Sequence, residues 1–117
     1  MPSIRDVVAA IRQRDGVEAV VVLGRDGVVI DSDTASAIDA DRVAAFVPAV
    51  LQAAEALAAT AELGALGTAV LEHDHGFAVI AGLSADAILL VFVQPTTELG
   101  ALLYELRRNR AGLSALV

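Results

Sequence analysis

The chain of 117 residues contains no cysteine, no tryptophan and no lysine, and its eight basic residues are all arginine. Without cysteine, disulfides, thiol catalysis and thiolate metal sites are excluded. Without lysine, the chain has neither the phosphate-binding lysine of a P-loop nucleotidase nor the amine of a Schiff-base enzyme. Aromatic residues are also scarce, with one Tyr and three Phe. A core must therefore be built from Val, Leu, Ile and Ala.

Charge and hydropathy disfavour nucleic acid and membrane as partners. The formal net charge is −7, whereas binding to phosphates needs clustered Lys and Arg. Residues 1–6 show no basic region followed by an apolar core, so no secretory signal is expected there. The longest strand-like apolar run, Ala87 to Val93, is far shorter than the roughly 20 residues that cross a bilayer. We expect one cytoplasmic domain over residues 1–117, without membrane insertion.

Residues 16–32 predict a β-hairpin. Two runs rich in β-branched residues flank Asp26-Gly27, a pair that favours a two-residue turn matching the twist of paired strands. A turn of that length places Leu23 opposite Ile30 and Val22 opposite Asp31. A short helix with apolar residues at i, i+3, i+4 and i+7 precedes the hairpin, namely Ile4, Val7, Val8 and Ile11.

The segment from Asp41 to Leu63 predicts a second helix with two apolar sides. Its core face is expected to hold Val43, Val47, Val50, Ala54, Leu57 and Ala61, with Phe46 and Leu51 flanking that face. Another side carries only small residues, at Ala45, Ala49, Ala53, Ala56 and Thr60. Pro48 removes one backbone hydrogen bond, so a kink is expected there.

Three further strands and a last helix complete the predicted order α-β-β-α-β-β-β-α. The strands are expected at Thr68 to Glu72, Phe77 to Leu83 and Ala87 to Val93, and Thr96 or Thr97 is expected to cap the helix that follows. Strands joined by tight turns are antiparallel. Residues 19–23 and 87–93 are apolar on both faces, so they are expected in the centre of the sheet. The predicted fold is α/β, of the α+β type, with a five-stranded antiparallel sheet between helices.

Taken in order, several short segments resemble the Roadblock family, which is named for a dynein light chain. They are Gly16-Val17, the Asp26-Gly27 turn, the Ala-rich helix ending near Glu62-Leu63-Gly64, and the opening of the last helix at Glu98-Leu99-Gly100. The resemblance implies homodimers in which the second helices lie antiparallel and adjacent edge strands extend the sheet. It also implies binding to Ras-like small GTPases, as for bacterial MglB-like regulators of MglA-type GTPases.

Two strips on the second helix are the candidate interfaces. Alanine at successive turns lets another helix approach closely, so the small stripe is expected to form the dimer contact through Ala45, Ala49, Ala53 and Ala56. By resemblance, the neighbouring strip is expected to contact the GTPase through Pro48, Gln52, Glu55 and Ala59.

Catalytic, metal and cofactor sites are not expected. His73 and His75 lack a third imidazole or thiolate, and the aspartates between Asp31 and Asp41 miss the glycine and glutamate of a calcium loop. No local pattern joins a serine to a histidine base. An arginine finger at Arg25 or Arg42 is the remaining catalytic idea, but exposed arginines mostly serve solubility.

We expect a protein that stimulates GTP hydrolysis in a Ras-like GTPase by acting on its switch loops, without enzyme chemistry of its own. The alternative is a dimeric scaffold that localises a GTPase or a signalling kinase without changing turnover. A third interpretation is a sensory domain that binds a small ligand between sheet and helices, which the Val/Ala/Leu core without convergent polar groups disfavours.

Overall fold

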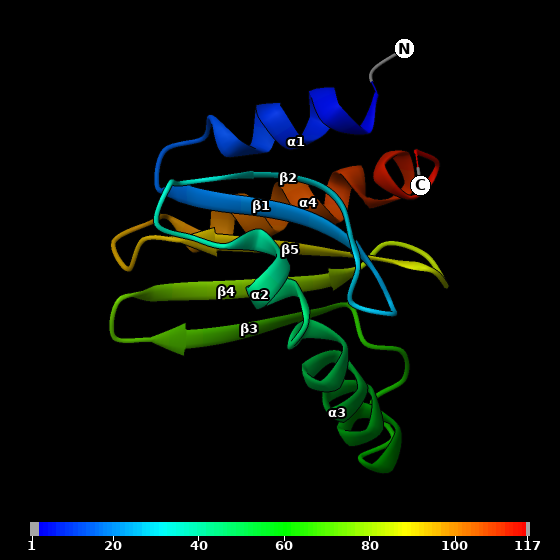
Figure 1. Ribbon diagram of the computed structural model, residues 1–117. Helices are drawn as coiled ribbons and strands as arrows, with labels where there is room; N and C mark the ends of the chain where they lie inside the picture. The colour runs from blue at the N-terminus through cyan, green and yellow to red at the C-terminus, as the bar shows by residue number, and fades with distance from the viewer. Residues whose placement is uncertain (1–2, 117) are drawn as a thin grey trace.

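A computed structural model describes residues 3–116, so Met1 and Pro2 of the segment searched for a secretory signal lie outside the described residues. The chain folds into one five-stranded antiparallel sheet with helices on both faces (Figure 1). The elements are α1 (Ile4–Arg12), β1 (Val17–Gly24), β2 (Val29–Thr34), α2 (Ala40–Ala44), α3 (Val47–Thr60), β3 (Thr68–His73), β4 (Gly76–Gly82), β5 (Ala87–Val93) and α4 (Leu99–Ser114). The predicted fold class is confirmed.

The strand order β2-β1-β5-β4-β3 places β1 and β5 next to each other in the centre, as predicted. Successive side chains of a strand point to opposite faces. In β1, Val20 and Val22 therefore join the core beneath α1 and α4, whereas Val21 and Leu23 join the core beneath α2 and α3. Both strands are buried on both faces because helices cover the sheet on each side.

The predicted hairpin forms, but one of its two predicted pairs is wrong. Val22 pairs with Asp31 as expected, whereas Leu23 pairs with Val29 rather than Ile30 because the register shifts between Val22 and Leu23. A β-bulge of this kind places an extra residue in one strand and increases the local twist. Ile30 consequently lies at 52% exposure.

α1 begins with a capping box in which Ser3 and Asp6 satisfy each other's backbone N–H groups. The Asp6 side chain accepts from the Ser3 backbone N–H at 2.9 Å, and the Asp6 N–H donates to the Ser3 hydroxyl at 3.2 Å. These hydrogen bonds favour the ionised carboxylate and lower the pKa of Asp6 below its usual value of 3.8.

α4 begins without the predicted threonine cap. Its N-cap residue is Glu98, which makes no side-chain capping hydrogen bond. The Thr97 hydroxyl instead lies buried beneath Gly16, without a hydrogen-bond partner among the described residues. Gly16 has φ +86°, and a Cβ at this position would overlap that hydroxyl.

Candidate protein interface on α3

The predicted helix from Asp41 to Leu63 is divided in the structure into α2 and α3. Asp39 caps α2 by accepting from the backbone N–H of Arg42 at 3.3 Å. Pro48 lies in the first turn of α3, where its missing N–H costs no intrahelical hydrogen bond. The break therefore falls at Ala45–Phe46 rather than as a kink inside one long helix. A Cβ added to Gly27 in the β1–β2 turn would come into ordinary van der Waals contact with Ala45 and Pro48 at this break.

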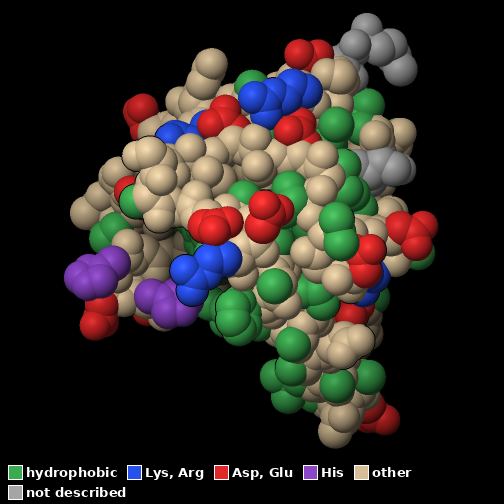
Figure 2. All heavy atoms as spheres, in the orientation of Figure 1, with side chains coloured by type: hydrophobic (Ala, Val, Ile, Leu, Met, Phe, Trp, Pro, Cys, Tyr) green, Lys and Arg blue, Asp and Glu red, His purple; other side chains and the backbone are tan. Residues whose placement is uncertain are grey.

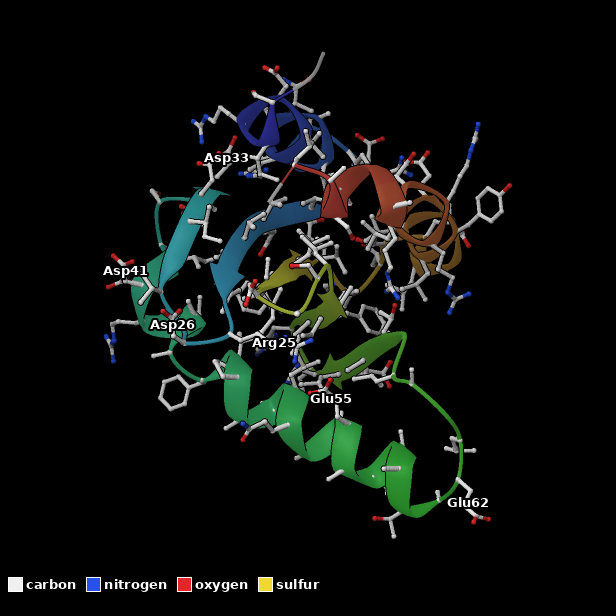
Figure 3. The ribbon with its side chains drawn as sticks, turned by 90° about the vertical axis from the view of Figure 1, so that its right-hand side faces the viewer. Arg25, Asp26, Asp33, Asp41, Glu55 and Glu62 are labelled. Carbon is white, nitrogen blue, oxygen red and sulfur yellow. The ribbon has the colours of Figure 1, made fainter. Side chains whose placement is uncertain are left out.

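The C-terminal end of α3 is closed by hydrogen bonds from Glu62 to Ala59 and from Leu63 to Ala58, the pattern of a Schellman motif. Glu62 takes the left-handed conformation, with φ 59°, at the position that glycine usually occupies in this motif. Figure 3 shows Glu62 at the far end of α3, away from the sheet. The helix ends three residues earlier than predicted.

The buried face of α3 is rotated from the predicted one. Val47, Leu51 and Ala58 are buried, and Val47 and Leu51 pack on the core beneath α2 and α3. The prediction was right for Val47 and wrong for Leu57, which is 68% exposed, and for the exposed Ala61. The remaining predicted core residues are half-buried, namely Val43, Val50 and Ala54.

The outer face of α3 is consequently apolar and exposed. Phe46, one of three phenylalanines in the chain, is 75% exposed and stands at the start of this face. The expected dimer residues all lie exposed along it, namely Ala45, Ala49, Ala53 and Ala56. Figure 2 shows hydrophobic side chains gathered over the part of the molecule that α3 forms. Such a continuous exposed apolar surface is typical of a protein interface.

The expected dimer set left out Phe46 and Leu57. The sequence does contain a signal for them, because Phe46, Val50, Ala53, Leu57 and Thr60 are spaced by four, three, four and three residues. That spacing is the seam of a helix that packs against another helix.

Residues 40–60, which span α2 and α3, also pass a test for membrane-spanning helices by length and composition alone, with a mean hydropathy of 1.6. In the structure this segment is divided at Ala45–Phe46, and one side of α3 packs on the sheet. Its high hydropathy therefore comes from a buried face and an exposed apolar face together.

The residues expected to contact a GTPase form a second strip beside the alanines. Gln52 and Ala59 are exposed, whereas Pro48 and Glu55 are half-buried. Glu55 and Ala59 line a hollow of about 420 Å³ together with Arg25 and the small residues of neighbouring loops. The structure brings all four strip residues to one side of α3, the side nearest the β1–β2 and β4–β5 turns.

A sequence profile of the Roadblock/LC7 domain family matches residues 4–92. The chain belongs to this family. The uncharacterized protein MJ1340 of Methanocaldococcus jannaschii is 28% identical over 110 residues, which cover 94% of this chain and 96% of that one.

Solved structures of similar fold include the gliding protein MglB of Thermus thermophilus, with a TM-score of 0.83 at 18% identity, covering 97% of this chain and 87% of that one. Another is an MglB described with a tetrameric arrangement, with a TM-score of 0.84 at 18% identity, covering 97% and 86%. At 18% identity, this likeness shows a shared fold and nothing further.

Arg25 of this Roadblock domain is held in place by its neighbours. Its Nη1 donates to Glu55 Oε1 at 3.2 Å, and its Nε donates to the Ser84 carbonyl at 3.4 Å. Figure 3 shows Arg25 and Glu55 pointing toward one another between the hairpin and α3. Arg42, the other expected candidate for an arginine finger, lies exposed on α2.

The histidines and aspartates considered above as metal ligands do not gather into a site in the described part of this Roadblock domain. Among residues 3–116, no group of three or more His, Asp and Glu side chains is close enough to hold a metal ion. Asp31 pairs with Arg5 at 3.0 Å, and Asp33 lies 3.7 Å from Arg12. These aspartates attach α1 to the edge strand β2.

Proposed function

We propose that this Roadblock domain is a cytoplasmic homodimer that regulates a Ras-like small GTPase of the MglA type. In this proposal it stimulates GTP hydrolysis by acting on the switch loops, and it contributes no active site of its own. The observation that carries the proposal is the exposed apolar face of α3, on which Phe46 is 75% and Leu57 68% exposed. Family membership and the similar fold of MglB structures support the same function.

The dimer is proposed to form by antiparallel packing of α3 against α3 of a second copy. Ala45, Ala49, Ala53 and Ala56 let the two helices approach closely, and Phe46 and Leu57 flank that contact. β3 is an edge strand of the sheet, and its Val70 and Leu71 are 38% and 37% exposed. An unpaired edge of this kind pairs readily with another strand, so β3 is the second proposed contact between copies.

The strip Pro48, Gln52, Glu55 and Ala59 is proposed to contact the GTPase. In a dimer that uses the alanine stripe, this strip remains on the neighbouring side of α3. A scaffold that only localises the GTPase or a kinase is the alternative, and neither function requires Arg25, which Glu55 engages in the structure.

The proposal is tested by single-turnover GTP hydrolysis of an MglA-type GTPase with and without this protein. Ala59→Arg places a large charge on the exposed strip and is expected to reduce the stimulation by about tenfold, a typical loss at an interface centre. Ala111→Arg, at an exposed position of α4 on the opposite face of the sheet, is the matched control and is expected to leave the stimulation unchanged.

Three outcomes separate the interpretations. Stimulation that Ala59→Arg reduces by about tenfold supports the proposed regulator. Binding without any change in hydrolysis favours the scaffold. Absence of both binding and stimulation contradicts the proposed partner.

A further inference from the structure

A second apolar surface lies on the opposite face of the sheet from α3, in a groove between α1 and α4. The groove has a volume of about 610 Å³. Buried leucines of α4 form its floor, and half-buried Val7 and Ile11 of α1 form one wall. The α4 residues are Leu102, Leu106 and Leu113.

The two helices are separated along this groove. Among residues 3–116, one ion pair links the two sides of the groove. It joins Arg14, which follows α1, to Glu105 of α4. Both residues line the groove. Ala10, which is exposed, forms the α1 rim with a side chain too small to cover the leucines.

Charge is distributed unevenly between this helical layer and the rest of the molecule. Residues 3–16 and 96–116 contain six of the eight arginines against four carboxylates, a net charge of +2, so the rest of the chain carries −9. Arg108 lies one helical turn from both Glu105 and Gly112, which line the groove, and therefore on the same edge of α4. It is exposed, and Tyr104, 65% exposed, lies one turn before it.

We propose that the α1–α4 groove binds an amphipathic helix of a partner protein that is acidic along one edge. Apolar residues of that helix at i, i+3 or i+4, and i+7 would enter the groove and cover the leucines. Its acidic edge would face α4 and meet Arg108, and its other edge would face α1, where the Asp6 carboxylate lines the groove. Exposed Tyr and Arg beside an apolar pocket are the residue types that contribute most to binding at protein interfaces.

A second copy of this chain fits the groove less well. α3, the chain's own exposed apolar helix, contains a single carboxylate, Glu55, and Arg25 already engages it. The groove and α3 also lie on opposite faces of the sheet (Figure 1), so both surfaces are accessible in one molecule. The helix-binding surface is thus independent of the proposed dimer and GTPase contacts.

Fluorescence polarisation with two labelled synthetic helical peptides tests this proposal on the full chain. Both peptides carry leucines at i, i+3 and i+7, and one has Glu along a flanking edge where the other has Lys. The Glu peptide is expected to bind saturably and about tenfold more tightly than the Lys peptide. Ala10→Trp, which fills the groove, and Arg108→Glu are each expected to weaken its binding about tenfold. The control Ala85→Trp is expected to bind as the wild type does.

Thermal unfolding confirms that each variant is folded, and Arg108→Glu, which changes only an exposed side chain, remains informative if Ala10→Trp does not fold. The proposal is overturned if the Glu peptide does not bind, if the two peptides bind equally, or if folded Ala10→Trp and Arg108→Glu bind like the wild type. A decrease in the sedimentation mass of Ala10→Trp would also overturn it, because the groove would then be occupied by a second copy.

Discussion

Arg25 connects three parts of the molecule that are distant in sequence. From the β1–β2 turn it contacts Glu55 on α3 and the Ser84 carbonyl in the β4–β5 turn. The Arg25 and Glu55 side chains are 37% and 41% exposed, and a pair this exposed contributes at most about 1 kcal/mol to stability. Its main consequence is positional, because it fixes one wall of the hollow beside the proposed GTPase strip.

Two glycines with similar positive φ are expected to differ in how much stability their substitution by alanine costs. Gly16 and Gly64 have φ of +86° and +82°, but a Cβ on Gly16 would overlap Thr97, whereas a Cβ on Gly64 would meet nothing within 4 Å. Gly64→Ala is expected to lower the unfolding free energy by about 1 kcal/mol, the cost of the left-handed conformation. Gly16→Ala is expected to lower it by about 3 kcal/mol, because steric overlap is added.

Urea denaturation of both variants measures this difference. Equal losses for Gly16→Ala and Gly64→Ala would show that Thr97 does not pack against Gly16 as described.

The capping box predicts a pH dependence at the start of α1. The pKa of Asp6 is lower in the folded chain than its usual value of 3.8. Its ionisation therefore stabilises the fold above the unfolded-state pKa, and this contribution is lost as the pH falls through the folded-state pKa. The unfolding free energy of wild type is expected to exceed that of Asp6→Asn at neutral pH, and the difference is expected to shrink as the pH falls below 3.8. A difference that stays constant over this range would contradict the assignment.

At the scale of elements, the sequence predicts that residues of α3 are helical but does not predict which side of α3 packs on the sheet. The strands, α1 and α4 were predicted within a few residues, because turn residues and apolar periodicity mark them, whereas α2 and α3 were predicted as one helix. The rotation of α3 was not predicted, because Val, Leu and Ala surround the helix and hydrophobicity alone does not say which side meets the sheet. The break at Ala45–Phe46 changes the rotation of α3 relative to α2, so a prediction of one continuous helix places the wrong side of α3 against the sheet.

The observed rotation predicts opposite behaviour for two leucines of α3. Leu51 is 2% exposed and Leu57 68% exposed. Leu51→Ala is expected to lower the unfolding free energy by about 3 kcal/mol at every protein concentration, since it leaves a cavity in the core. Leu57→Ala is expected to destabilise only at concentrations where the chain is dimeric. Thermal unfolding over a dilution series tests both, and a large loss for Leu57→Ala in dilute, monomeric protein would contradict the rotation.

At the scale of the whole molecule, the sheet separates two helical layers with different surfaces. The α2–α3 layer presents an apolar face edged by carboxylates, including Asp41, which points outward in Figure 3. The α1–α4 layer carries a net positive charge and an apolar groove. The sequence predicted the sheet and both layers from the order of elements. It did not predict the groove, because that depends on how far apart α1 and α4 pack.

The outer face of α3 is proposed to join two copies of the chain, and sedimentation equilibrium measures this directly. The wild type is expected to sediment at twice the chain mass of 12.0 kDa at tens of micromolar. Ala53→Arg, in the middle of the exposed face, is expected to sediment at the single-chain mass while remaining folded, and the control Ala85→Arg at twice that mass. A wild-type protein that sediments as a monomer at these concentrations would contradict the proposed α3 contact between copies.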